Sequence, residues 1–208
     1  EKVLLTSLES GDAQQITNAM RDIVEVCTFK EVNVKKLAMF DLEYIFLKLR
    51  AKSVGENADI LVKCSDETCK ADNAVRVNLD LVELKGDPRA ESTIQLTDSV
   101  GVSIKYPTVE RTEEVMKGIK AENQIDLILG LMVASIDSIY DAEKVYPSTD
   151  STPQELMDFI ESLNKEQFNK FETFFEQFPK LKEEIEFTCE KCGKENTRTL
   201  EGLNDFFG

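Results

Sequence analysis

The sequence predicts an α+β fold that is mostly helical and contains antiparallel β-hairpins. Apolar residues recur at helical spacing in residues 2–52 and 111–178. In two other segments they alternate with polar residues, which is the pattern of strands with one buried face. Each alternating segment has a pair of cysteines at the position of its turn. Helices interleaved with hairpins are typical of the α+β class, and 208 residues suffice for one large domain or two small ones.

Two helices are predicted in the N-terminal part, residues 1–56. The first spans 2–29 and is interrupted just before Asp12, which is expected to cap its second half. Cys27 lies on the apolar side of this helix and is interpreted as a small buried residue. The second helix spans 34–52 and is apolar on more than one side, so we expect it to be central.

A β-hairpin part, residues 57–106, follows. Strands are predicted at 60–64 and 75–81, with the first cysteine pair between them. Two shorter strands are predicted at 93–96 and 102–106, joined by a turn. This part therefore consists of two successive hairpins.

Helical patterns return in residues 107–180. Helices are predicted over 111–121 and 124–140, and a loop over 146–153. The longest apolar-rich run of the chain, Ile125–Ile136, falls in the second helix. It is too short and too polar to span a bilayer, so it is interpreted as a buried helix, and we expect no membrane partner.

Two capping boxes mark the next helix starts. Thr152 precedes Pro153 and lies three residues before Glu155, and Asn164 has Gln167 at the same spacing. The phenylalanines from Phe168 to Phe178 are interpreted as core.

The C-terminal part, residues 181–208, mirrors the first hairpin. A strand leads into the second cysteine pair, a strand returns over 196–200, and 203–207 forms a last helical turn. We expect this hairpin to pack back on residues 57–81 and the whole chain to fold as one cooperative unit.

The two cysteine pairs predict a zinc-ribbon-like site. Its ligands are Cys64, Cys69, Cys189 and Cys192. Two hairpin turns that each present two thiolates can hold one tetrahedral zinc ion. Gly193 permits the positive φ that closes the second turn. Four sulfurs leave no open coordination position, so the zinc would be structural.

Two other interpretations of the pairs stay open. The cysteines can be reduced thiols in two independent hairpins, because more than a hundred residues separate the pairs. A redox role is less favoured, since a redox C-x-x-C usually opens a helix after a strand, whereas this one caps a hairpin.

Composition excludes several function classes. The chain has no histidine, which excludes histidine bases and histidine metal ligands. Its formal net charge of −15 argues against nucleic acid and favours basic protein partners, or simply solubility. No phosphate-binding glycine motif is present. Carboxylate pairs such as Asp41 with Glu43 are interpreted as solvated or salt-bridged, so we expect no enzyme. No secretory signal is visible, and a reducing cytosol is expected.

Short segments spread over nearly the whole chain resemble one protein family. They are EKVLL (1–5), LESGD (8–12), FDLEYIFLKLRAKS (40–53), IQLTD (94–98), KYP (105–107), YD (140–141), VY (145–146), EKC (190–192), LEGL (200–203) and FFG (206–208). Through them the chain resembles the T4-type phage baseplate family that contains the hub-assembly protein and the hub-assembly catalyst. The segment 40–53 is the most specific. Family members usually start some forty residues earlier, so upstream residues are expected to be missing here.

The resemblance implies an assembly factor that acts in the host cytoplasm. Such a chaperone or assembly catalyst binds baseplate hub proteins during tail morphogenesis and performs no covalent chemistry; a homo-oligomer stays open. The alternative is a structural hub subunit retained in the virion. An acidic mimic of nucleic acid is less favoured, because acids alternate with lysines throughout the chain.

Overall fold

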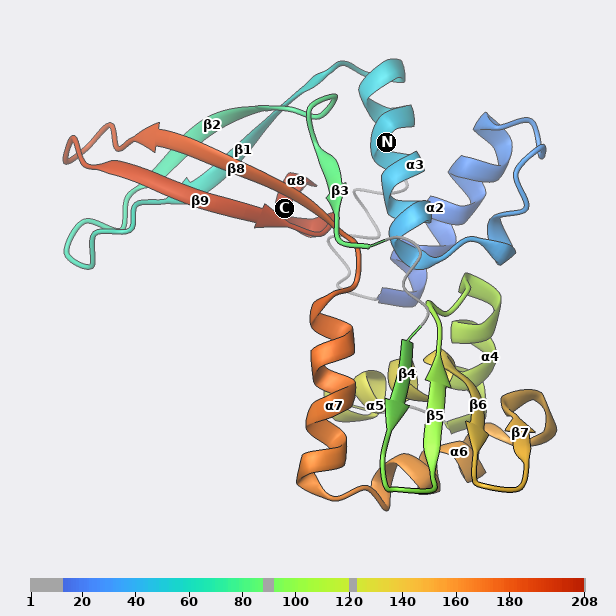
Figure 1. The fold of residues 1–208 in the computed structure, drawn as a ribbon. Coiled ribbons are helices and arrows are strands. Elements are labelled where there is room, and N and C mark those ends of the chain that lie inside the picture. Colours follow the sequence, from blue (N-terminus) through green and yellow to red (C-terminus); the bar gives the residue numbers. More distant parts are fainter. Residues whose placement is uncertain (1–12, 88–91, 120–122, 208) are drawn as a thin grey trace. The chain divides into compact units, whose positions relative to one another are not determined.

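The computed structural model describes residues 13–87, 92–119 and 123–207 (Figure 1). Helices and antiparallel sheets are both present, which confirms the α+β prediction. In chain order the elements are α2 (Ala13–Cys27), η1 (Val34–Lys36), α3 (Met39–Ser53), β1 (Asn57–Lys63), β2 (Asp72–Asn78), β3 (Glu83–Lys85), β4 (Ser92–Gln95), β5 (Gly101–Ile104), α4 (Val109–Ile119), α5 (Gln124–Ser135), β6 (Ile136–Tyr140), β7 (Val145–Pro147), η2 (Ser148–Asp150), α6 (Pro153–Glu161), α7 (Lys165–Glu176), β8 (Lys180–Thr188), β9 (Glu195–Glu201) and α8 (Asn204–Phe207).

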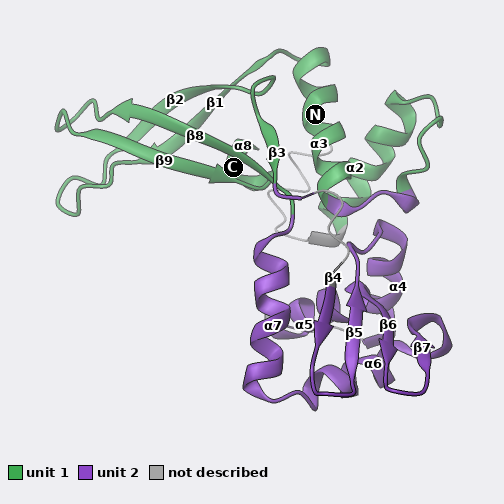
Figure 2. Cartoon of the chain, in the orientation of Figure 1, with its two compact units in different colours: residues 1–34, 40–85, 179–208 green, residues 35–39, 86–178 purple. Residues whose placement is uncertain are grey.

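The chain divides into two compact units, coloured green and purple in Figure 2. Unit 1 comprises residues 1–34, 40–85 and 179–208, and unit 2 comprises residues 35–39 and 86–178. Unit 1 is thus assembled from segments far apart in the sequence, whereas unit 2 is nearly one continuous stretch.

In unit 1 two small antiparallel sheets accompany α2 and α3. One is the β1–β2 hairpin and the other has the order β3-β8-β9. Alternate β1 residues, Ala58, Ile60 and Val62, are buried and their neighbours are exposed, as the period-two pattern predicted. Central α3 residues such as Leu42 and Leu47 are fully buried, in agreement with the central place predicted for this helix.

In unit 2 a four-stranded antiparallel sheet of order β4-β5-β6-β7 packs with helices α4 to α7. Its core joins strand residues such as Val102 and Ile104 to Ile160 of α6 and Phe171 of α7. Phe171 and Phe174 are buried, and the other phenylalanines of that helix are packed against the same core, which confirms the interpretation of the phenylalanine stripe. Both predicted capping boxes are formed.

The helix predicted over 124–140 is wrong in its last five residues. The chain leaves the helix at Ile136, whose ψ is 120°, and continues as β6. There Ile139 pairs with Val102 of β5. Ile136, Ile139 and Tyr140 have the spacing of a helix face, but they belong to the sheet. β-Branched isoleucines also suit a strand, and only the pairing with β5 decides between helix and strand.

Three further predictions are corrected. The loop over 146–153 contains β7 and η2, because Tyr146 pairs with Ile139. The strand predicted to Leu81 ends at Asn78, whose side-chain oxygen accepts the Asp80 N–H and turns the chain. Cys27 is exposed, not buried, at the C-terminal end of α2. The predicted cap at Asp12 and the helical segment before it lie outside the described residues.

The apolar helix expected to be buried, α5, is buried only in part. Its last turn, Met132 to Ser135, is covered, but four large apolar side chains nearer its start are exposed. They are Ile125, Leu127, Ile128 and Leu131.

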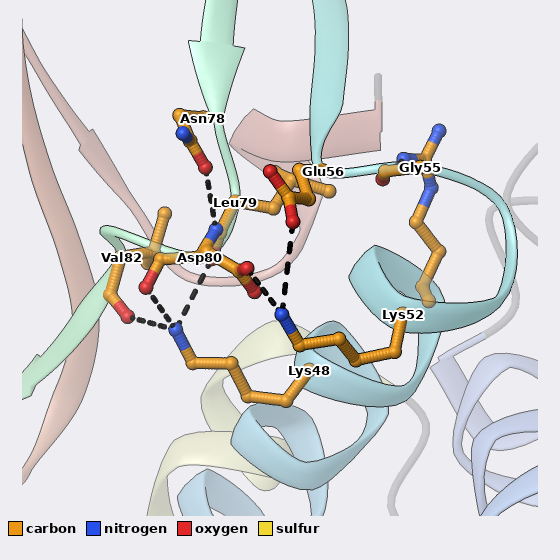
Figure 3. A network of polar contacts seen from close by, with 9 residues as sticks. Lys48, Lys52, Gly55, Glu56, Asn78, Leu79, Asp80 and Val82 are labelled. Carbon is orange, nitrogen blue, oxygen red and sulfur yellow. Dashed lines mark hydrogen bonds and ion pairs between the residues drawn. The ribbon is translucent and has the colours of Figure 1, made fainter.

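One lysine of α3 holds the turn between β2 and β3 (Figure 3). The Lys48 Nζ donates to the carbonyl oxygens of Leu79, Asp80 and Val82, at 3.2, 2.7 and 2.9 Å. One helical turn later, Lys52 pairs with the Asp80 carboxylate at 2.5 Å, and this hydrogen bond lowers the pKa of Asp80. The Lys48 ammonium group thus provides hydrogen-bond donors to three carbonyl groups of the turn, which have no partner strand in the described part of the chain.

Replacing Lys48 with methionine tests this contact. Lys48→Met keeps the length of the side chain but removes the donors, so we expect the free energy of unfolding to fall by about 2–3 kcal/mol. Lys63→Met is the control, because Lys63 makes only an exposed ion pair with Asp72 and should cost less than about 1 kcal/mol. Urea denaturation of both variants measures the difference, and equal losses would contradict the role of Lys48.

Candidate metal centre

Two hairpin turns of unit 1 bring four cysteines together. Cys64 follows the last residue of β1, and Cys69 lies three residues before β2; Cys189 and Cys192 take the same places between β8 and β9. Their four sulfur atoms all lie within 4.8 Å of one another. The sequence-predicted ligand residues therefore form one cluster, although the two halves of the cluster are separated by more than a hundred residues of chain.

The spacing of the sulfurs fits a tetrahedral ion. The Cys64 and Cys192 Sγ atoms are 3.7 Å apart, and those of Cys69 and Cys189 are 3.8 Å apart. A disulfide would bring two sulfurs to about 2.05 Å. Four thiolates at about 2.3 Å from a zinc ion lie about 3.8 Å from one another. These two sulfur–sulfur distances thus match those of a four-thiolate metal site and are too long for disulfides.

Both turns have the same backbone geometry despite their different lengths. In each, the N–H of the first cysteine donates to the carbonyl two residues beyond the second cysteine, that of Ala71 at 2.9 Å and that of Lys194 at 2.8 Å. The residue directly after the second cysteine has a positive φ, 42° at Lys70 and 73° at Gly193. The prediction for Gly193 is confirmed, and Lys70 takes the same conformation without the freedom of glycine.

Two buried asparagines connect the turns to each other. Asn73 and Asn196, each four residues after the second cysteine of its pair, are only 3% and 5% exposed. The Asn73 Oδ1 accepts the Glu190 N–H at 3.0 Å. The Asn196 Oδ1 accepts the N–H and the hydroxyl of Ser65 at 2.8 and 2.7 Å. Each asparagine thus bonds the residue that directly follows the first cysteine of the opposite turn.

These contacts relate the two hairpins by an approximate two-fold symmetry. Exchanging the hairpins places Cys64 on Cys189, Cys69 on Cys192 and Asn73 on Asn196, and it exchanges the two short sulfur contacts. Each asparagine Nδ2 also donates to the carbonyl two residues before it, at 2.9 and 2.7 Å. Sequence reasoning missed both asparagines, although the repeated spacing Cys-x-x-x-Asn was a signal for them.

The sulfurs differ in how readily they ionise. The backbone N–H of Cys192, with further help from that of Lys191, lowers the pKa of Cys189 to about 6. At Cys64 the N–H of Asp66 acts in the same direction, but burial and the neighbouring thiols outweigh it and raise the pKa. Cys189 is therefore more readily a thiolate, the form that binds metal, than Cys64.

The carboxylate pair of α3 does not form a site. Asp41 and Glu43 are two residues apart on a helix, so their side chains leave it in directions about 200° apart. Burial raises the pKa of Glu43 to about 7. Glu43 is thus a half-buried carboxyl group that does not share a site with Asp41.

The fold and the cysteine cluster together define a class of protein. It is an acidic α+β protein in which two distant hairpins meet in a zinc-ribbon-like module. None of the described helices has the length and apolar character needed to cross a membrane.

The chain belongs to the family described as T4 bacteriophage base plate protein, whose model matches residues 1–208. The predicted resemblance is thereby confirmed over the full length. No curated protein and no solved structure is significantly similar to the chain.

Removing either asparagine tests the two-fold arrangement. Asn73→Ala and Asn196→Ala each remove one hydrogen bond to an N–H of the opposite turn and one to a carbonyl of the same turn. At about 0.5–1.5 kcal/mol for each bond, each variant should lower the free energy of unfolding by about 1–3 kcal/mol. The loss at Asn196 should be at least as large, because Asn196 also bonds the Ser65 hydroxyl. Asn57→Ala, on the exposed side of β1, is the control.

Unfolding is followed in urea, with and without a chelator. The asparagine bonds do not involve the cysteine sulfurs, so the losses should persist in the chelator. A loss in only one of the two variants would show that the hairpins are not equivalent.

Proposed function

We propose that the protein is an assembly factor of the phage baseplate hub. It binds hub proteins in the host cytoplasm while the tail is built, acts by binding without covalent chemistry, and leaves before the particle is complete. The observation that carries this proposal is the match of the whole chain to a baseplate family. Membership makes other baseplate proteins its natural partners.

The charge of the chain supports a transient binding role. A net charge of −15 attracts basic partner surfaces and accelerates their encounter. Complementary charge raises association rates and selects partners more than it adds affinity. A factor that must find a hub protein quickly and later release it benefits from both properties.

We further propose that Cys64, Cys69, Cys189 and Cys192 bind one structural zinc ion. Thiolate ligands in tetrahedral arrangement are typical of zinc, and the sulfur spacing supports this geometry. The ion would join hairpins whose paired cysteines are 120 and 128 residues apart. Its binding free energy would therefore stabilise the folded form of unit 1.

Metal content and melting test the zinc proposal. Protein purified without added zinc should carry one zinc per chain by elemental mass spectrometry. Cys192→Ser should lower the melting temperature, and a chelator should lower that of the wild type but hardly that of the variant. Cys27→Ser, which changes an exposed cysteine outside the cluster, is the control. Absence of metal, with identical melting of wild type and Cys192→Ser, would contradict the proposal.

A structural subunit retained in the virion is the second candidate. The description of the matched family, a base plate protein, favours it. The two candidates differ in whether the chain remains in the finished particle.

Quantitative mass spectrometry of infected cells and of purified particles separates them. We expect the protein to copurify with hub precursors from cell extracts and to be absent from mature particles. Baseplate proteins of known copy number in the same samples serve as the internal control. Stoichiometric amounts in mature particles would overturn the assembly-factor proposal in favour of the structural subunit.

A further inference from the structure

Helix α5 of unit 2 carries an apolar face that the described residues do not cover. Ile125 is 68% exposed and Ile128 is 58% exposed, and Leu127 and Leu131 are exposed with them. At about 100° per residue these four side chains fall on one side of the helix. Large apolar residues exposed singly are ordinary, but a contiguous group on one helix is typical of an interaction surface.

The orientation of α5 is fixed by its packing. A Cβ atom on Gly130 would lie 2.8 Å from the Ile119 side chain and 2.9 Å from that of Met116, so α4 packs directly on the α5 backbone there. On the covered part of the helix, Met132 and Val133 belong to the core of unit 2. Since α5 also continues directly into β6, it cannot rotate to bury its outer face without breaking these contacts.

The outer face of α5 has no charged side chain to keep it in water. The only ionisable residue of the helix is Asp126, which forms the capping box with Asn123 at the helix start. A helix that is apolar on all sides is normally buried, so this one lacks a covering on its outer side.

The two helices that pack most closely against α5 are acidic. Both α4 and α6 pack against α5. The three helices carry seven acidic and two basic side chains. Both basic groups pair with acids of α4 itself, Arg111 with Glu114 and Lys117 with Glu113. On α6 the exposed positions include Glu155, Asp158 and Glu161.

We propose that the outer face of α5 is the docking surface for an amphipathic helix of a hub protein, with an apolar stripe flanked by lysine or arginine. The stripe would cover the four exposed α5 side chains, and the basic flanks would face the carboxylates of α4 and α6. This inference rests on the proposed function, because it names the surface through which a hub protein binds.

A second copy of the chain fits this surface poorly. Two copies facing each other through α5 would both have acidic helices packed against α5, and each chain carries a net charge of −15. Charge complementarity therefore favours a basic partner.

The experiment uses the full chain and a labelled 18-residue peptide built from leucine and lysine, with the leucines at helical spacing. Fluorescence anisotropy should show binding that weakens as salt is added. A peptide of the same pattern with glutamate in place of lysine should bind at least tenfold more weakly. A peptide with the same composition but with the leucines scattered around the helix should lose a similar factor.

Matched variants locate the binding. Ile128→Gln should weaken binding of the lysine peptide about tenfold or more, since it puts a polar group at the centre of the contact. Leu61→Gln is the control, because Leu61 is as exposed, at 70%, but lies on β1 of unit 1. Asp158→Asn with Glu161→Gln should reduce the salt dependence. Unchanged melting of Ile128→Gln shows that its fold is intact.

Three results with the purified protein would overturn the inference. They are equal binding of the lysine and glutamate peptides, equal effects of Ile128→Gln and Leu61→Gln, and a dimer in sedimentation equilibrium that Ile128→Gln dissociates. The last would assign the face to a second copy. If hub precursors still copurify with Ile128→Gln at wild-type levels, the docking surface is wrong while the assembly function stands. Retention of the protein in mature particles would reject the assembly function and leave the peptide result intact.

Discussion

The closure of two distant hairpins upon each other is the constraint on which unit 1 depends. A two-stranded hairpin is only marginally stable alone, and bringing together residues 120 or more apart in the chain costs loop-closure entropy. Four sulfurs and two buried asparagines provide the contacts that offset this cost. Because each asparagine bonds the opposite turn, these hydrogen bonds hold the two hairpin turns next to each other, and none of them involves a cysteine sulfur.

Unit 2 does not have to bring distant hairpins together. Its chain is nearly continuous, so no long loop must be closed, and its sheet and helices share one apolar core. Nothing in the described part of that core is a metal ligand. The two units therefore rest on different interactions: unit 2 on apolar burial, and unit 1 on polar and sulfur contacts at the hairpin tips as well as on the apolar residues of α3 and the strands.

Local patterns in the sequence were enough to predict the hairpins and the capping boxes, because each depends on residues close in the chain. The cysteine cluster joins residues 120 or more apart, and it was predicted from its chemistry, because two turns that each present two thiolates suit one metal ion. Asn73 and Asn196 were missed because their hydrogen-bond partners lie in the opposite hairpin, so the repeated spacing Cys-x-x-x-Asn alone did not show what they bond. The change from α5 to β6 was missed because Ile136, Ile139 and Tyr140 keep the i, i+3, i+4 spacing of a helix, and only the pairing of β6 with β5 decides for a strand. The burial predicted for Cys27 was wrong because a residue at the edge of an apolar helix face can be exposed to solvent, as Cys27 is at the end of α2.

Exposed apolar surface and high net charge are consistent with each other in this protein. An uncovered helix such as α5 would promote self-association in a neutral chain. A net charge of −15 makes copies of the chain repel one another, and both helices that pack against α5 carry more acidic than basic side chains. The same charges attract a basic partner, so one feature opposes the wrong contact and favours the right one. An apolar face can therefore stay open in solution until a partner with the opposite charge arrives.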